Sequence, residues 1–276
     1  MKSLTWLHRI YFAAVGLLAL RVGFAGYFCP AEIGQMIPWQ VPPMHSRFLG
    51  AMYLSGLVFM IGAVLARRWC EVKVVTPMIA IWTGMLFLVS LFHRHEFDYS
   101  LRQVWIWYGA YFIYPLVAAW LAWRHRHDAS HPQASTPLPV WARRYLNAQG
   151  AVFTLAALAL LIAPTAMLSL WPWKATPLLL QIYSAPFLSY GLGSLMLARQ
   201  NVWLEVRLGA VALFTFSSLV LAASIVHRKL FSLAENSDRV WFVLFSTVTA
   251  SLAVLTVRAF AASFEANQKP VANPRN

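Results

Sequence analysis

The segment Trp69-Cys70-Glu71-Val72-Lys73 recurs 134 residues later as Trp203-Leu204-Glu205-Val206-Arg207. The same offset superposes other rare residues without a gap. They are Pro30 on Pro164, Pro38-Trp39 on Pro172-Trp173, Pro43 on Pro177, His93-Arg94-x-x-Phe97 on His227-Arg228-x-x-Phe231, Trp107 on Trp241 and Arg124 on Arg258. A chance register would not keep Trp, Pro and His aligned over such a length, so the sequence predicts a tandem duplication.

The composition is that of a membrane protein. Hydrophobic residues make up 60% of the chain and charged residues only 11%, whereas a soluble domain carries about 25% charged residues. Eight stretches reach the roughly 20 apolar residues that a helix needs to cross a bilayer core. These predicted spans are residues 10–28, 46–66, 72–92, 104–123, 145–163, 178–198, 206–226 and 240–261.

Each repeat therefore holds four predicted helices. Because four is an even number, both repeats enter and leave on the same side of the membrane, which indicates parallel repeats related by a pseudo-twofold axis along the membrane normal. We predict an all-α integral membrane protein with eight transmembrane helices. Its expected parts are a first four-helix repeat (1–124), a cytoplasmic linker (125–143), a second four-helix repeat (144–262) and a disordered C-terminal tail (263–276).

The net charge of +13 indicates a membrane topology and not a nucleic-acid partner. With the N-terminus inside, 14 Lys and Arg residues fall in inner segments and seven in outer loops. Such an excess marks the cytoplasmic side. We therefore expect a multi-pass protein of the inner (plasma) membrane with both termini in the cytoplasm. The expected partners are the lipid bilayer and a small anionic or lipid ligand, with no nucleic acid, and the sequence does not identify a protein partner.

Charged residues of the first half often have an uncharged counterpart in the second. Arg21 aligns with Leu155, Glu32 with Ala166, His45 with Leu179, Arg47 with Gln181, Glu96 with Leu230 and Asp98 with Ser232. A charge inside a transmembrane helix is costly unless it is paired or hydrated, so Arg21 is a candidate for ligand contact. Alternatively its long side chain reaches the headgroups or pairs with an acid of the outer loops: Glu32, Glu96 or Asp98.

His93 and His227 are the aligned histidines. With a real twofold axis they lie at one membrane depth, where two imidazoles can ligate a haem iron or another metal. They can also bind an anionic group, with Arg228 adjacent, or cap helix ends at the interface. A second polar cluster, His125, His127, Asp128 and His131, fits either a metal site or a flexible linker.

No Walker loop, HExxH, CxxC or GxSxG motif occurs in the sequence, so an enzyme is not favoured and no catalytic residue is assigned. The leading hypothesis is binding or transport of a small amphipathic or anionic ligand, a lipid among the candidates, near the outer leaflet. The candidate ligand-binding residues are Arg21, Glu32, Arg47, His93, Glu96, Asp98, His227 and Arg228. The alternatives are a redox protein that holds haem or a metal through His93 and His227, and a non-catalytic structural or assembly subunit.

Overall fold

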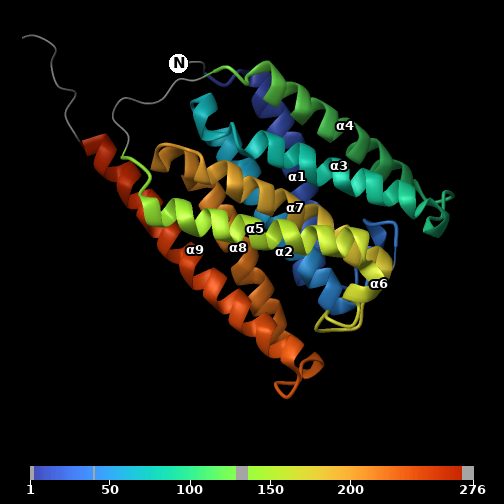
Figure 1. Ribbon diagram of the computed structural model, residues 1–276. Helices are drawn as coiled ribbons and strands as arrows, with labels where there is room; N and C mark the ends of the chain where they lie inside the picture. Colours follow the sequence, from blue (N-terminus) through green and yellow to red (C-terminus); the bar gives the residue numbers. More distant parts are fainter. Residues whose placement is uncertain (1–2, 40, 129–135, 269–276) are drawn as a thin grey trace, which may run out of the picture.

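The computed structural model describes residues 3–39, 41–128 and 136–268, which form helices and no strand (Figure 1). The long helices are α1 (Trp6–Phe28), α2 (Pro43–Leu65), α3 (Val75–Phe92), α4 (Arg102–Arg124), α5 (Val140–Ile162), α7 (Pro177–Ala198), α8 (Trp203–Val226) and α9 (Asn236–Gln268). Short helical turns are η1 (Ile33–Gln35), η2 (Trp69–Glu71), η3 (Arg94–Glu96), α6 (Pro164–Met167) and η4 (Arg228–Leu230). The prediction of an all-α chain is confirmed over these residues.

Seven of the long helices are long and apolar enough to cross a membrane, and they identify a multi-pass membrane protein. They are α1, α2, α3, α4, α5, α8 and α9. Helix α7 coincides with the predicted span 178–198 but is less apolar, because it contains Gln181 and several Ser and Tyr residues. Its polar side chains are mostly buried against other helices, as Ser184, Ser189 and Ser194 are. The count of eight spans therefore stays a prediction.

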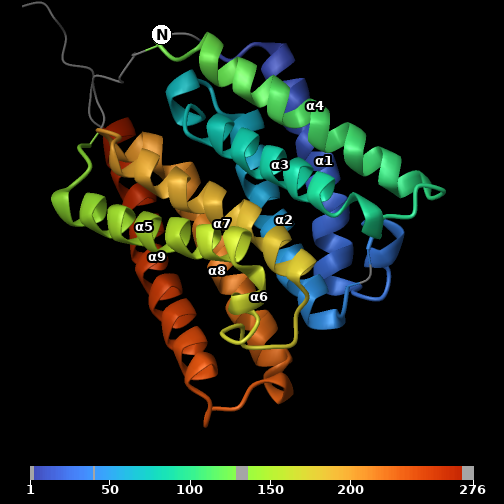
Figure 2. The same ribbon diagram turned by 45° about the vertical axis from the view of Figure 1, so that its right-hand side comes forward.

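The helices pack as a central group, which consists of α2, α3, α7 and α8, and an outer group, which consists of α1, α4, α5 and α9. Helix α2 packs on α1 and α8, and α7 packs on α5 and α3, while α4 covers α3 and α9 covers α8. Helices α4 and α9 consequently lie at opposite edges of the bundle (Figures 1 and 2). The outer helices keep large apolar side chains exposed, among them Leu17, Ile162 and Val257. Apolar side chains on the perimeter are what a helix that faces lipid requires.

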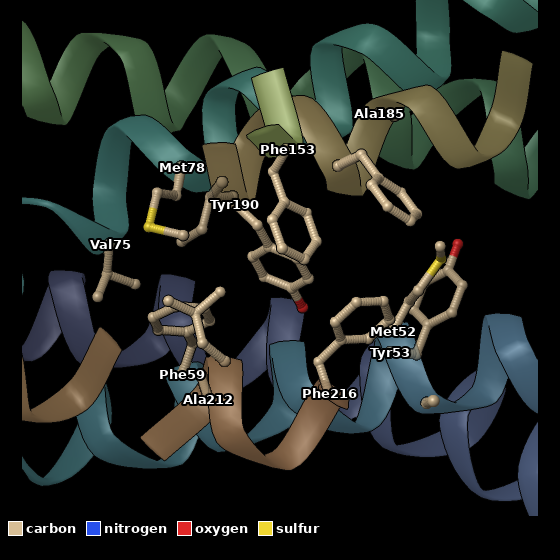
Figure 3. Packing of buried hydrophobic residues seen from close by; sticks show 14 of the residues in the cluster. Met52, Tyr53, Phe59, Val75, Met78, Phe153, Ala185, Tyr190, Ala212 and Phe216 are labelled. Carbon is tan, nitrogen blue, oxygen red and sulfur yellow. The ribbon is translucent and has the colours of Figure 1, made fainter. Parts of the chain in front are cut away.

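The centre of the bundle is aromatic (Figure 3). The ring of Tyr190 in α7 packs on that of Phe216 in α8, with 5.1 Å between the ring centroids. The Tyr190 hydroxyl hydrogen-bonds to Ser55 of α2, so three central helices meet at this side chain. A buried tyrosine needs such a partner for its hydroxyl.

Two boundaries differ from the prediction. Helix α5 begins at Val140, so residues 140–143 are helical although they were expected in the linker. Helix α9 continues to Gln268, so residues 263–268 are helical and not part of a disordered tail. The sequence there contains no Gly or Pro to end the helix. Residues 129–135 of the linker and 269–276 of the tail lie outside the described residues.

Candidate functional site

The bundle has two ends, which we call the terminal face and the distal face. At the terminal face α1 begins, α4 ends, α5 begins and α9 ends (Figures 1 and 2). This is the face that the sequence predicts to be cytoplasmic. The distal face contains η1, η3, α6 and η4, and it carries all the predicted ligand-binding residues except Arg21, which lies within α1.

Two of the side-chain contacts that join the halves of the chain at the distal face link aligned positions. Arg47 Nη1 in α2 lies 2.7 Å from His227 Nε2, at the end of α8. His93 Nε2, at the end of α3, lies 2.5 Å from Gln181 Oε1 in α7. Arg47 aligns with Gln181, and His93 aligns with His227. In both contacts, therefore, the repeat position of Arg47 in one half meets the repeat position of His93 in the other half.

The ring of His93 faces two acceptor oxygens. Its Nε2 faces Gln181 Oε1, and its Nδ1 lies 2.9 Å from Glu96 Oε1. The Gln181 amide is oriented by its Nε2, which donates to the carbonyl of Leu161 at 2.8 Å. Both ring nitrogens therefore face acceptor oxygens, and one of these belongs to the carboxylate of Glu96.

The environment of His227 is the opposite. Its Nε2 accepts from the Arg47 guanidinium, so that nitrogen carries no proton. Burial and the charge of Arg47 both lower the pKa of His227. Within the described residues no carboxylate lies within ion-pair distance of Arg47. Arg228 and Lys229 follow in η4 with exposed side chains, so positive charge accumulates beside this contact.

Tryptophans of the loops pack against tryptophans of the helices in both halves. Trp39 packs edge-on against Trp107, with 4.8 Å between ring centroids. Trp173 packs in the same way against Trp241, at 4.9 Å. The Nε1 of Trp107 donates to Ser90 Oγ, and that of Trp241 donates to Ser224 Oγ, at 2.8 and 3.0 Å. The repeated tryptophans are therefore in contact with each other within each half.

His45 is a buried residue that the sequence indicated only through its alignment with Leu179. Its side chain lies in α2, where 1% of the residue is exposed. Nε2 lies 2.8 Å from the carbonyl oxygen of Lys174 and donates to it. Nδ1 accepts from the hydroxyl of Tyr183 at 2.5 Å and from Nε1 of Trp173 at 3.3 Å. His45 thus fixes the second-half loop onto a first-half helix.

The other predicted site residues stand apart from these contacts. Arg21 is exposed on α1, and the described residues include no ion pair between Arg21 and an acid. Glu32 is exposed beside η1. Asp98 accepts from the backbone N and from Oγ of Ser100, at 3.0 and 2.7 Å, and these bonds lower its pKa. Arg21 therefore fits a side chain that extends along the lipid toward the headgroups.

The candidate histidines His93, His125 and His227 form hydrogen bonds and are not arranged around a shared centre. His93 and His227 each direct Nε2 at a residue of the other half, as described above. At the terminal face His125 Nε2 lies 3.2 Å from His8 Nε2, and its Nδ1 lies 2.7 Å from Asp128 Oδ2. No cluster of three or more His, Cys, Asp or Glu suited to a metal occurs in the described part of the chain. His131 lies outside the described residues.

Comparison of the chain with known protein families, with curated proteins and with solved structures finds no match. The geometry of the distal face is therefore the basis on which a function can be proposed. That face combines an arginine without an acid partner, a neutral imidazole and exposed cations. Such a combination can receive an anion.

Proposed function

We propose that this chain is an inner-membrane protein of two four-helix repeats that binds or transports a small amphipathic anion, a lipid among the candidates, at its distal face. Contacts that recur 134 residues apart support the two repeats and their pseudo-twofold axis. Besides the tryptophan pairs, the hydroxyl of Tyr11 donates to the carbonyl of Tyr114 at 2.8 Å, and that of Tyr145 donates to the carbonyl of Val248 at 3.4 Å. An eighth span through α7 completes the arrangement.

The unneutralised guanidinium of Arg47 is the observation that carries the proposal. Its side chain is half-buried between α2 and α8, and its partner His227 is held in the neutral form. A partly buried charge without a counter-charge is unfavourable, so an anion that enters here gains a charge-assisted hydrogen bond. The aligned contact between His93 and Gln181 does not offer a comparable site for an anion. The carboxylate of Glu96 already occupies the position beside the His93 ring.

The surroundings of Arg47 favour an amphipathic anion over a free one. Ile225 and Val226 end helix α8 just before His227, and 55% and 66% of these residues are exposed. They offer apolar contact to a chain that lies along the bundle. Arg228, exposed on η4, is close in sequence to the same position and adds attraction for the anionic head. Arg21, exposed on α1, is proposed as a further cation on the lipid side.

The test is a binding titration of purified protein with dihexanoyl phosphatidylglycerol, an anionic short-chain lipid, beside dihexanoyl phosphatidylcholine. Arg47→Gln is the informative variant, because the second half carries Gln181 at the aligned position. We expect it to weaken binding of the anionic lipid by at least about fivefold, the effect of one interfacial cation. Arg94→Gln, which removes an exposed arginine of the same face, is the matched control and should bind as the wild type does.

Equal affinity of the wild type and Arg47→Gln for the anionic lipid would refute the site. Arg21→Leu is the second variant, and we expect it to weaken binding while the protein remains folded and extractable. If Arg21→Leu binds normally, Arg21 does not belong to the site. An absorption spectrum of the same preparation tests the alternative with haem, which predicts a haem band that His93→Ala removes. Co-purification of a protein partner would support the structural alternative.

A further inference from the structure

A groove opens at the terminal face between α5 and α9. It encloses about 430 Å³ and is lined by Pro139, Trp141, Trp203, Val254 and Arg258. Ligand pockets usually enclose about 300–1,000 Å³. Helices α5 and α9 lie close together at this end of the bundle and diverge toward the distal face (Figures 1 and 2).

The walls of the groove are apolar and aromatic. Trp203 is buried, with 5% of the residue exposed, and its ring lies 5.9 Å from that of Trp141 between centroids. Trp141 and Val254 stand at the opening, with 46% and 54% exposed. Tryptophan at the end of a transmembrane helix is typical of the level of the lipid headgroups.

Arg258 supplies the charge of the groove. Its side chain is exposed, and it is the one charged residue among those that line the groove. Within the described residues no acid forms an ion pair with it. A guanidinium beside apolar walls at the headgroup level is complementary to a phosphate that carries acyl chains.

The aligned tryptophan of the first half has different neighbours. Trp69, which corresponds to Trp203, packs against the rings of His8 and His125, at 5.8 and 4.4 Å between centroids, and these two imidazole rings are 5.2 Å apart. The second half has Ala142 and Ala259 at the positions of those two histidines. The ring of Trp203 therefore lacks the two imidazoles that pack against Trp69, and small alanine side chains stand in their place beside the groove.

We propose that this groove binds an anionic phospholipid from the leaflet at the terminal face. The phosphate pairs with Arg258, and an acyl chain lies against Trp141 and Val254. The site is separate from Arg47, because it lies at the other end of the bundle and uses different residues. It anchors the second half, where α9 packs on α8 and diverges from α5.

Native mass spectrometry of the protein released from nanodiscs of equal phosphatidylglycerol and phosphatidylcholine content tests this. We expect the wild type to retain phosphatidylglycerol preferentially, and we expect the species that carries a second phosphatidylglycerol, besides the one at the distal face, to be about fivefold less abundant in Arg258→Gln. The matched control is Arg124→Gln, since Arg124 is exposed at the aligned position at the end of α4. This variant should retain phosphatidylglycerol as the wild type does.

Val254→Trp is a second variant that leaves the charge unchanged. It installs the residue that the first half carries at the aligned position, Trp120, and it should reduce retention by filling the groove. Equal retention by the wild type and Arg258→Gln would overturn the proposal. So would equal losses in Arg258→Gln and Arg124→Gln, which would show that surface charge alone attracts the lipid. Because Arg47 is intact in all of these variants, failure here leaves the distal site unaffected.

Discussion

Lys73 Nζ lies 2.6 Å from Oε1 of Glu205, a contact that joins the first half of the chain to the second. The aligned contact runs in the opposite direction, with Arg207 Nη2 at 3.3 Å from Oε2 of Glu71. Both lie at the terminal face, and the contacts of Arg47 and His93 cross between the halves at the distal face. The halves are thus held together by polar contacts at both ends of the bundle.

Lys73→Met should destabilise the protein by about 1–3 kcal/mol, because it deprives the fully buried carboxylate of Glu205 of a charged donor. The double-mutant cycle with Glu205→Gln should give a larger coupling energy than the cycle of Arg207→Met with Glu71→Gln. The second contact is longer, and its side chains are 32% and 13% exposed. Thermal unfolding in detergent measures both energies. Equal coupling energies would show that burial does not distinguish the two contacts.

Gly50→Ala should also destabilise the protein, by about 1–3 kcal/mol, because α1 and α2 approach too closely for a methyl group. A Cβ on Gly50 would lie 2.4 Å from the backbone N of Tyr27. The control is Gly109→Ala in α4, where a Cβ would meet nothing within 4 Å. That variant should match the wild type or gain up to about 1 kcal/mol from helix propensity. A melting temperature for Gly50→Ala at or above that of Gly109→Ala would contradict the prediction.

The sequence predicts the helices well, since a membrane-spanning helix must be apolar over its whole length and its loops need not be. The predicted span 46–66 corresponds to α2, Pro43–Leu65, and the span 206–226 lies within α8, Trp203–Val226. Helix α7 is harder to recognise as a span, because its polar side chains face other helices. These buried polar side chains agree with the position of α7 at the centre of the bundle, where it packs on α5 and α3.

The contacts of the candidate site could not be predicted in the same way. The alignment identified Arg47 with Gln181 and His93 with His227, but it did not show that each residue contacts the non-equivalent one of the other half. That crossing depends on how α2 packs on α8 and α3 on α7. His45 carried no motif at all, because its partners come from a loop and a helix about 130 residues away.

His45→Leu should destabilise the protein by about 2–4 kcal/mol, although Leu179 occupies the aligned position of the second half. The substitution leaves the Tyr183 hydroxyl and the Trp173 N–H without their acceptor. Tyr183→Phe is the milder comparison, because it removes one donor while Trp173 still donates to His45. We expect a loss of about 1 kcal/mol for it. Similar melting temperatures for His45→Leu and the wild type would show that these buried groups find other partners.

The stability of the protein should fall in weak acid because of His227. Burial and the neighbouring Arg47 lower the pKa of His227 from its ordinary value of 6.5. The unfolded chain, in which this pKa is not lowered, therefore binds a proton more readily than the folded protein. The contribution of His227 to stability is present above pH 6.5 and decreases as the pH falls below it. The protonated ring also loses the lone pair that accepts from Arg47.

Melting temperatures measured between about pH 5 and pH 8 check this expectation, since that interval covers the titration of histidine. Arg47→Gln should flatten the decrease in acid, because a neutral amide at that position does not oppose protonation of His227. His227→Gln should flatten it further, since the titrating group is removed. His95→Gln removes an exposed histidine of η3 and should leave the pH profile of the wild type. An identical acid slope in the wild type and His227→Gln would mean that other groups govern the pH dependence, and that the contact with Arg47 does not hold the ring neutral.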